Sequence, residues 1–509
     1  MSLTPARRRR IDRLVAAALA AITVVVVAIV YLTSDIRATT VDAGPVEAAP
    51  DAPVTVPSSL SPVWELTTDP ALGAVASPYG VVVTADEHTV TGSDAVTGAQ
   101  RWTFSRENLP LCAIGSGDTD ARGVTTRGKV RGVMTVFEKG GSCSQVRLID
   151  PVTGERHYDR TSPNQVGGAL AFGGPYAAWL GPDLLELWRD DLVRTIQYGD
   201  QPQPTKADTL HTGCLFSDIA LADTQFATIE HCAATGGGAR LVINWATPDS
   251  APNKPDGQDV FKHDPRADID TGSPAARIVG ITQDRVAVLV SAPEPAVVVY
   301  DATGTETSRT PVDIPAQDIQ DADVVPTAPG ATDPVGVHIT PSVQGDDVRY
   351  SLVGSHLLAV SQNQIQVPAP ATSTSATTSA PTSGGSIGAA GSFGSAGGAF
   401  GSLATSGTAT TTAVGAEPAA TVSARDLTLR WTTDQVRGLP ALIGDAVLVP
   451  VDAGLEVLAE IAGTPRVVPG TADTTVLPVD RGGWTGRVDA AAVGTVVVET
   501  RGGTVVGLS

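Results

Sequence analysis

The sequence predicts an all-β fold, a β-propeller of eight four-stranded blades that follows one N-terminal membrane-spanning helix. Only 4% of the 509 residues are aromatic, while Val, Ala, Gly and Thr are abundant. Small and β-branched side chains suit the pleated surface of a sheet better than a long helix. A short motif that recurs along the chain further predicts that the strands form repeated units.

The recurring motif consists of an Asp, a Thr-Gly turn and a strand that carries a large aromatic residue. Its clearest copy is GSDAVTGAQRWTF, in which Asp94 precedes Gly98 and Trp102. An Asp side chain can accept hydrogen bonds from N–H groups inside such a turn, and Gly adopts the positive φ there. We expect the Trp to pack against the neighbouring unit.

Two further copies differ from the first in the aromatic position. The second has Tyr158 in the place of the Trp, and the third is one residue shorter and has no aromatic. Their other motif residues are Asp150 and Gly154 in RLIDPVTGERHYD, and Asp301 and Gly304 in VVVYDATGTETSRT. Apolar or alternating runs precede each copy and a strand follows it, so each unit is a small antiparallel sheet. Such sheets cover their faces when they are arranged radially as propeller blades.

Counting the units predicts eight blades, and the alternative is seven because two of the segments are short. Seven of the blades are expected near residues 79–104, 111–159, 168–198, 211–246, 277–315, 350–435 and 439–470. The eighth is shared between the two ends of the chain. SPVWELTTD, with Trp64, supplies a single strand, and the C-terminal residues 492–509 supply two inner strands that lack a Trp strand. Joining the two would close the ring.

A low-complexity insertion interrupts one predicted blade. Residues 369–420 are rich in Ser, Thr, Gly and Ala without hydrophobic periodicity, so we expect this segment to be disordered. HLLAVSQNQIQVP before it reads as two inner strands, and DLTLRWTTD after it, with Trp431, reads as the Trp strand. The insertion is therefore expected to replace a turn between two strands of one blade.

An almost unbroken apolar run, residues 14–32, predicts one membrane-spanning helix. A buried core helix and a cleaved signal peptide are the alternatives. A cluster of arginines before the run argues against the first, and the absence of a small-residue cleavage site after it argues against the second. The arginines are Arg7, Arg8, Arg9, Arg10 and Arg13.

Basic residues beside a span stay in the cytoplasm, which predicts the topology. Residues 1–13 would form a cytoplasmic basic tail, and residues 33–60 a linker outside the cytoplasm, rich in Ala and Pro, that holds the ring away from the membrane. Residues 61–509 would form the propeller. The expected location is the cell membrane, with a single pass and an extracytoplasmic propeller.

All four cysteines follow the span and would therefore meet an oxidising compartment. Cys214 and Cys232 lie on two strands that flank a polar turn, so we expect them to pair across a hairpin. Cys112 and Cys143 would form the second disulfide. The alternative is a zinc site with two imidazoles and two thiolates, from His211, Cys214, His231 and Cys232. Adjacent residues of a strand point to opposite faces, which argues against convergence of His231 and Cys232.

The DAVTGAQRWTF and DPVTGERHYD segments resemble the repeat of the pyrroloquinoline-quinone-like propellers. This family includes quinoprotein dehydrogenases and a non-enzymatic outer-membrane assembly lipoprotein. The resemblance implies the propeller fold. A quinone-dependent dehydrogenase would also need a calcium site, a catalytic Asp and aromatic stacking on the axis, and the sequence does not supply that set. The assembly role does not transfer either, because the anchor expected here is a helix and not a lipid on cysteine.

Other chemistries have little support in the sequence. The net charge of −20 disfavours nucleic acid as a partner, because phosphate binding needs clustered Lys and Arg. Two acidic clusters could hold calcium but are better explained as solvated loops: Asp264, Asp268 and Asp270, and Asp318, Asp321 and Asp323.

These observations predict a non-catalytic scaffold in the cell envelope. The expected partner is another envelope protein, and no metal, cofactor or catalytic residue is expected. The alternative is an enzyme or ligand sensor that uses the central funnel of the propeller, with a dehydrogenase of the quinone-using kind as its specific case.

Overall fold

The structure is a computed structural model that describes residues 5–32, 34–46, 55–117, 132–202, 211–247, 265–324, 336–345, 347–368, 421–461, 464–465 and 475–509. The expected disorder of 369–420 falls outside the described residues. The chain divides into two compact units, one of residues 1–363 and 425–509 and one of residues 364–424. The first unit holds the propeller.

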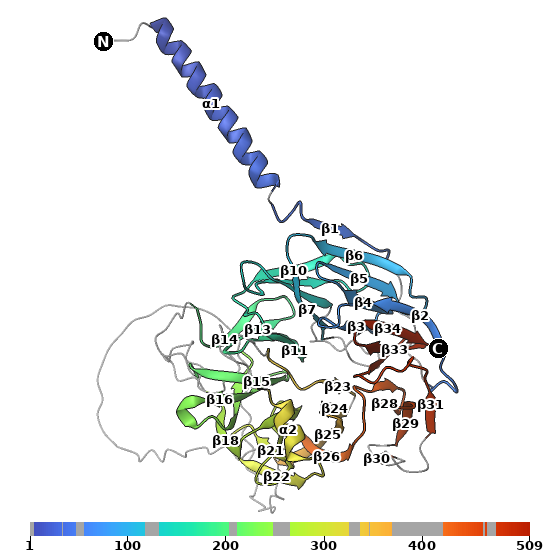
Figure 1. The fold of residues 1–509 in the computed structure, drawn as a ribbon. Coiled ribbons are helices and arrows are strands. Elements are labelled where there is room, and N and C mark those ends of the chain that lie inside the picture. Colours follow the sequence, from blue (N-terminus) through green and yellow to red (C-terminus); the bar gives the residue numbers. More distant parts are fainter. Residues whose placement is uncertain are drawn as a thin grey trace, which may run out of the picture. The chain divides into compact units, whose positions relative to one another are not determined.

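The N-terminal helix α1 runs from Pro5 to Leu32 (Figure 1). Within it, residues 12–32 have a mean hydropathy of 2.8 and none of them is buried. A helix of this length and composition can cross a bilayer, and a signal sequence near the N-terminus has the same properties. The helix is therefore a membrane anchor or a signal.

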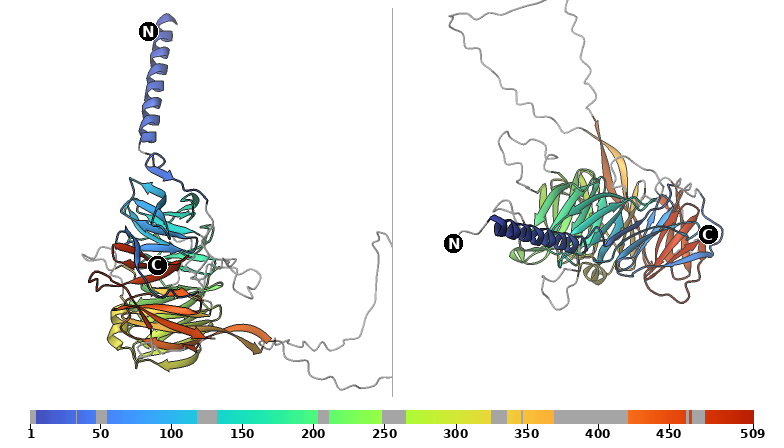
Figure 2. Two further views of the ribbon diagram at one scale, coloured as in Figure 1. Left: turned by 90° about the vertical axis from the view of Figure 1, so that its right-hand side faces the viewer. Right: turned by 90° about the horizontal axis from the view of Figure 1, so that it is seen from above.

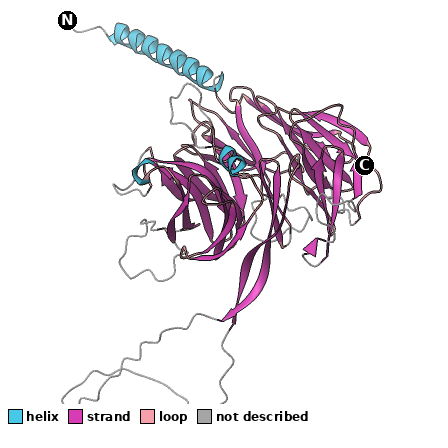
Figure 3. Ribbon diagram, turned by 60° about the horizontal axis from the view of Figure 1, so that its bottom comes forward, coloured by secondary structure: helices cyan, strands magenta, loops and turns pink. Residues whose placement is uncertain are grey.

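Strands dominate the rest of the described chain (Figure 3), and they form eight antiparallel sheets that we call blades 1 to 8 in chain order. In each blade the strands are named from the innermost outward. Blade 1 contains β3 (Ala74–Ser77), β4 (Val81–Ala85), β5 (Thr89–Asp94) and β6 (Gln100–Arg106), and β1 (Thr39–Asp42) pairs with β6 as a fifth strand. Blade 2 contains β7 (Leu111–Ser116), β8 (Val133–Phe137), β9 (Gln145–Ile149) and β10 (Arg156–Thr161). Blade 3 contains β11 (Ala169–Gly173), β12 (Tyr176–Leu180), β13 (Leu184–Arg189) and β14 (Arg194–Gly199).

The next two blades follow the same order. Blade 4 contains β15 (Cys214–Leu221), β16 (Gln225–Cys232), β17 (Ala239–Trp245) and β18 (Ala267–Ser273), with the short 3-10 helix η1 (Ala233–Thr235) between β16 and β17. Blade 5 contains β19 (Ala276–Ile281), β20 (Arg285–Val290), β21 (Ala296–Asp301) and β22 (Glu306–Pro311). The helix α2 (Ala316–Ala322) follows blade 5.

The last three blades complete the set. Blade 6 contains β23 (Ser342–Gln344), β24 (Val348–Val353), β25 (His356–Pro368) and β26 (Thr421–Thr433). Blade 7 contains β27 (Ala441–Ile443), β28 (Ala446–Val451), β29 (Gly454–Ile461) and β31 (Thr475–Pro478), and β30 (Thr464–Pro465) pairs with the end of β29. Blade 8 contains β32 (Asp489–Val493), β33 (Val496–Arg501), β34 (Thr504–Leu508) and, outermost, β2 (Pro62–Thr67).

The hydrophobic core establishes that the blades form a ring. It divides into eight clusters of buried side chains, and each cluster joins one blade to the next. One of them joins blade 8 to blade 1. Each blade therefore buries both faces against its neighbours, which a single small sheet cannot do alone. The predicted all-β propeller of eight four-stranded blades is confirmed.

The two ends of the chain close the ring, as the sequence predicts. Strand β2 pairs with β34 from Pro62 opposite Leu508 to Thr67 opposite Thr504. Two backbone hydrogen bonds of 2.9 and 3.0 Å join Ser61 and Ser509 beyond the strands. In Figures 1 and 2 the blue N-terminal strands and the red C-terminal strands lie side by side.

Five strands lie wholly outside the blade ranges that the sequence predicts. Strands β3 and β23 precede residues 79 and 350, β18 and β31 follow residues 246 and 470, and β1 lies within the expected linker 33–60. Six residues separate the end of α1 from β1, a distance of about 20 Å at most. The linker is thus shorter than expected, because its first part is a strand of blade 1.

The insertion 369–420 lies between β25 and β26, which are neighbouring strands of blade 6. The segment therefore replaces the turn between two adjacent strands, as the sequence predicts. The expectation that residues 356–368 form two inner strands is wrong, because they form the single strand β25. The described strands on both sides belong to one sheet, so the insertion does not divide the propeller into two domains.

Two disulfides are present, and they are the two pairs expected from the sequence. Cys112 and Cys143 link β7 to the segment before β9 in blade 2. Cys214 and Cys232 lie directly opposite each other in the register of β15 and β16.

Candidate functional site

The recurring motif forms the contact between successive blades. Trp64 of blade 8 donates its indole N–H to the carbonyl of Ala95 in blade 1 (3.0 Å), and Trp102 of blade 1 donates to Pro151 in blade 2 (2.9 Å). Both acceptors directly follow the motif Asp. A Cβ on Gly98 would lie 2.8 Å from Trp64, and one on Gly154 would lie 2.7 Å from Trp102. The motif glycine therefore leaves room for the Trp of the preceding blade.

The motif aspartates hold the turns in shape. One carboxylate oxygen of Asp94 accepts hydrogen bonds from the N–H groups of Val96 and Thr97, at 2.9 and 2.7 Å. Asp150 and Asp301 bind the N–H groups of their own turns in the same way. Burial alone would raise the pKa of Asp94, but the hydrogen bonds of Thr97 and the contact with Arg101 outweigh it and lower that pKa. These carboxylates therefore shape the turns, as the sequence predicts.

The third copy shows the same contact with a different side chain. A Cβ on Gly304 of blade 5 would lie 3.0 Å from the Ile269 side chain on β18, the outer strand of blade 4. Trp431, on the outer strand of blade 6, lies in the core between blades 6 and 7, with its ring 6.0 Å from that of Tyr350. An aliphatic or aromatic residue of the outer strand thus covers the next blade.

Tyr158 does not take the place of the Trp, which corrects the alignment of the second copy. Its side chain is 47% exposed. The following blade has no Thr-Gly turn, and Leu192 adopts the positive φ there instead. Arg160 donates to the Leu192 carbonyl (3.2 Å) and so adds a polar contact to the apolar core between blades 2 and 3.

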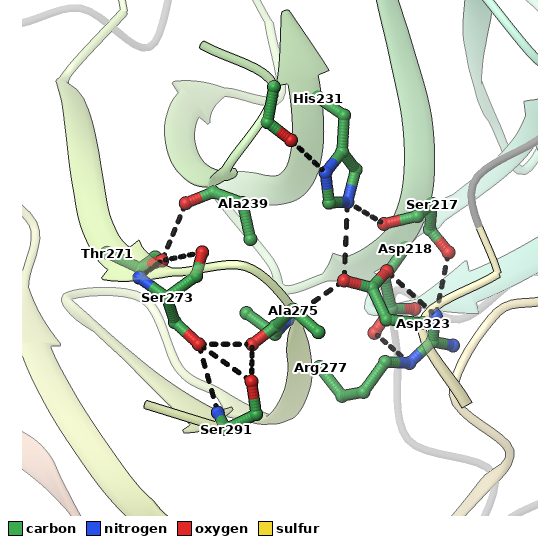
Figure 4. Close-up of polar contacts among 12 residues, drawn as sticks. Ser217, Asp218, His231, Ala239, Thr271, Ser273, Ala275, Arg277, Ser291 and Asp323 are labelled. Carbon is green, nitrogen blue, oxygen red and sulfur yellow. Dashed lines mark hydrogen bonds and ion pairs between the residues drawn. The ribbon is translucent and has the colours of Figure 1, made fainter. Parts of the chain in front are cut away.

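A buried polar cluster joins blades 4, 5 and 6 near the inner strands (Figure 4). Asp218 on β15 accepts hydrogen bonds from the N–H groups of Ile278 on β19 and Thr340 before β23, each of 2.8 Å. Arg277 donates to the Thr340 hydroxyl (2.8 Å) and to the Ser217 carbonyl (2.9 Å). All these side chains are buried, so the cluster fixes three inner strands relative to one another.

The same cluster holds a serine, a histidine and an aspartate, but not in a catalytic arrangement. The Ser217 hydroxyl and the Asp323 carboxylate both lie 3.2 Å from Nε2 of His231, while Nδ1 faces the Gly237 carbonyl at 3.1 Å. A serine nucleophile needs the base and its orienting carboxylate on opposite ring nitrogens. Burial would lower the pKa of His231, but the hydrogen bond and charge of Asp323 outweigh it and raise that pKa. Because Asp323 is buried, the expectation that it lies in a solvated loop is wrong.

The structure contradicts the zinc alternative, because the two cysteines form a disulfide and His231 does not join the cluster. Ligand atoms of His211, Cys214, Glu230 and Cys232 lie within 4.8 Å of one another, so Glu230 takes the place expected for His231. The disulfide occupies both sulfurs. His211 instead contacts Glu230 at 2.8 Å. Burial would lower the pKa of His211, but the hydrogen bond and charge of Glu230 outweigh it and raise that pKa.

The other acidic residues of the two predicted clusters have separate partners. Asp268 pairs with Arg240, and Asp270 accepts a hydrogen bond from the N–H of Gly272. Asp318 pairs with His356, and Asp321 accepts from Gln317. Asp264 lies outside the described residues. The described members therefore do not converge on a common point.

A central cavity of about 580 Å³ lies on the axis of the ring. The innermost strands of seven blades line it, all except β19 of blade 5. Small and aliphatic side chains make up most of the wall, with Phe172 as its aromatic member. Its titratable side chains, among the described residues, are His338, Arg349, Arg487 and Asp489. A cavity of this size and polarity can hold a small organic molecule.

A second hollow of about 430 Å³ adjoins the central cavity, and we call it the rim cleft. It shares His338, Ile339, Pro341 and Arg487 with the cavity, and the end of α2 and residues 436–437 and 485–487 also line it. Beside it Trp484 is 44% exposed, with its ring over Gly486 and Gly502 and its indole N–H bonded to the Arg487 carbonyl (3.0 Å). An exposed Trp between arginines is typical of a protein-binding surface.

The sequence reasoning missed the residues of both hollows. The signal for Trp484 was its place in the Gly-rich loop DRGGWTGR, where a large aromatic has no sheet to cover it. The signal for Arg349 was a charge between the apolar residues of VRYSLV. Neither pattern alone indicates that the residues lie on the ring axis.

The fold defines a β-propeller with eight blades. No family model matches the chain, and no curated protein matches it. Among solved structures, the C-terminal WD40 domain of Sif2 is similar, with 8% sequence identity, a TM-score of 0.40, and coverage of 89% of this chain and 99% of that chain. The blade count given above comes from the sheets and core clusters of this chain.

Proposed function

We propose that this chain is a membrane-anchored, extracytoplasmic scaffold that binds another envelope protein without catalysing a reaction. The observation that carries the proposal is the rim cleft with Trp484 beside it. The Asp-Thr-Gly turns support a relationship to the pyrroloquinoline-quinone-like propellers. That relationship is part of the proposal.

The composition of the rim favours a protein as the ligand. Trp and Arg are over-represented among residues that dominate protein interfaces, because each combines a large contact area with hydrogen-bond donors. Here Arg437 and Arg487 line the cleft, and their side chains are 33% and 48% exposed. Arg437 also donates to the Thr485 carbonyl, which holds the loop with Trp484 against blade 7. The loop is thus held in place by a hydrogen bond before a partner arrives, and ordering of this kind lowers the entropy cost of binding.

The N-terminal helix and the disulfides support the location. Helix α1 is apolar and exposed along residues 12–32, and Arg9 and Arg13 lie at its N-terminal end. Disulfides persist in oxidising compartments, which favours a propeller outside the cytoplasm. A short connection from α1 to β1 would then keep blade 1 near the membrane.

Site-specific photo-crosslinking in intact cells tests the proposal. A photoreactive amino acid replaces Trp484 in the full-length chain, and the matched control carries it at Tyr158, which is exposed to a similar extent. We expect a crosslinked product of defined mass from position 484 and none from position 158. In a parallel pull-down, Trp484→Ala should reduce recovery of that protein at least about tenfold.

Equal crosslinking from both positions, or none from position 484, would contradict the assignment of the rim cleft as the interface. Turnover of a substrate by the purified chain, abolished by a substitution in the central cavity, would favour the enzyme alternative instead.

A further inference from the structure

Among the described residues, the central cavity holds one cation without a partner. Arg349 lies on β24, and its side chain lines the cavity. Its Nε is buried and has no hydrogen-bond partner in the described chain. No hydrogen bond or ion pair from the described residues reaches its other guanidinium nitrogens. Within the part of the chain that the structure describes, Arg349 is therefore a half-buried charge without a partner, and a molecule inside the cavity can satisfy it.

The other charges of the cavity do not compensate Arg349. Both carboxylate oxygens of Asp489 lie 2.9 Å from Nε of Arg487, so these two residues neutralise each other. Asp218, the acidic group whose charge acts on Arg349, is already bound to the Thr340 hydroxyl and to three backbone N–H groups. The described part of the cavity wall thus carries one unbalanced positive charge among apolar surroundings.

An unpaired buried charge destabilises the folded state, and proteins retain one mainly where a bound ligand neutralises it. Burial lowers the pKa of Arg349, and the charge of Asp218 only partly opposes this effect. A guanidinium binds carboxylates well, because its parallel N–H groups match both oxygens. The overall charge of −20 would disfavour entry of an anion, so a local cation is needed to hold one.

We propose that the central cavity binds a small amphiphilic monocarboxylate, with its carboxylate on Arg349 and its apolar body against the inner strands. One net positive charge matches a monoanion and not a polyanion. The wall offers Leu170, Phe172 and Leu442 to the apolar body. The cavity adjoins the rim cleft, but Arg349 does not line the cleft, and neither Trp484 nor Arg437 lines the cavity. Substitutions at Arg349 and at Trp484 therefore test the two assignments independently.

Isothermal titration calorimetry on the full-length chain in lipid nanodiscs tests the proposal. The probes are acetate, cyclohexanecarboxylate and 4-phenylbutanoate, with 4-phenylbutanamide as the uncharged control. Affinity should rise with the apolar size of the acid and be lost for the amide. Arg349→Met should weaken binding of 4-phenylbutanoate about 10- to 100-fold, because a charge-assisted hydrogen bond pair is lost.

Two further variants separate binding from folding. Ala491→Phe should also weaken binding, because residue 491 lines the cavity and a larger side chain fills it. The matched control Arg309→Met removes an arginine from β22, outside the cavity wall, and should leave binding unchanged. Without ligand, Arg349→Met should melt at a higher temperature than the natural chain, because an unpaired charge is removed.

Several outcomes would overturn the proposal. These are no titration by any of the three acids, equal binding of acid and amide, and unchanged affinity in Arg349→Met. A lower melting temperature of the unliganded variant would show that Arg349 is already satisfied within the protein. Binding of a peptide through its terminal carboxylate, with no free acid bound, would assign the cavity to a protein partner.

Discussion

At the residue scale, one glycine and one tryptophan join each of two pairs of neighbouring blades. Gly154 has a φ of +75°, and the Trp102 ring covers the place where a side chain would project. The position therefore excludes other residues for two independent reasons, backbone conformation and lack of space. A second glycine of the same blade, Gly140, has a φ of +66°, but a Cβ added there would meet no atom within 4 Å, so it shares only the first reason.

Gly154→Ala should consequently destabilise the protein more than Gly140→Ala. The shared backbone cost is about 1–2 kcal/mol, and displacement of Trp102 should add about 1–3 kcal/mol for Gly154→Ala. Denaturant unfolding followed by tryptophan fluorescence measures the difference. Equal losses of unfolding free energy in the two variants would mean that Trp102 can move away from residue 154 without destabilising the contact between blades 1 and 2.

His211 should make stability depend on pH. Its raised pKa means that the folded protein binds the proton more tightly than the unfolded chain, whose histidine pKa is about 6.5. The stabilisation is then fully present below about pH 6.5 and is lost as the pH rises through the raised folded pKa. The free-energy difference between the natural chain and His211→Gln should be larger at pH 5.5 than at pH 8.5. A difference that stays constant over this range would refute the assignment.

The turn residues could be predicted from the sequence because they act within one turn. The residues whose partners lie far along the chain could not be predicted. Asp94 and Gly98 act within one turn, so their roles follow from the residues around them. Arg277 contacts segments about 60 residues away on either side, and no local pattern specifies such a partner. The exposure of Tyr158 was equally hidden, because it depends on the turn that blade 3 presents and not on the sequence of blade 2.

At the scale of elements, the short connection between helix α1 and strand β1 is held against the propeller. Asp35, in the short connection between them, accepts hydrogen bonds from Lys139 (2.6 Å) and Asn108 (3.0 Å) and lies 3.4 Å from Arg106. The hydrogen bond from Lys139 is the main cause of the lowered pKa of Asp35. The contact and the pairing of β1 with β6 attach the connection to the propeller. The sequence indicated a linker here, because β1 has four residues and its pairing partner lies about 60 residues further along.

Helix α1 leads to a prediction about topology. A reporter that is active only outside the cytoplasm should be active when fused after Ser509 and inactive when fused before Arg7. The arginines before the apolar run should remain in the cytoplasm. Reporter activity in intact cells measures the topology. Membrane fractionation measures the anchoring, and the full-length chain should remain with the membrane after carbonate extraction. The reverse reporter pattern, or release of the propeller into the soluble fraction, would contradict the anchor.

At the scale of the whole molecule, the ring forms because each repeated unit must bury both of its apolar faces against neighbouring units. Each blade has two apolar faces, and the eight core clusters show that every face meets another blade. The repeat and the incomplete units at the two ends were sufficient to predict closure. The central cavity was not predictable in the same way, because its wall is assembled from a few residues of each of seven blades.

Closure predicts opposite results for two deletions. Deleting residues 372–416 should leave the melting temperature nearly unchanged, because β25 and β26 are adjacent strands and a shorter turn can join them. Deleting residues 61–69 removes β2 with Trp64, which contacts Gly507 of its own blade and Gly98 of blade 1. The edge of β34 would be exposed and the contact between blades 8 and 1 would be lost, so the melting temperature should fall steeply and aggregation should follow.

Comparing the two deletions is a further test of the fold, because the deletion that removes more residues should lower the melting temperature less. A protein whose units behaved as independent domains would respond to the number of residues removed, and 45 residues would matter more than nine. In a closed ring the response depends on how many blade contacts are broken, and the strand at residues 61–69 takes part in two. Thermal melts with light scattering, on both full-length variants in the same detergent, distinguish these cases. A large fall for the deletion of 372–416, or an unchanged melt without 61–69, would show that the blades do not close through β2.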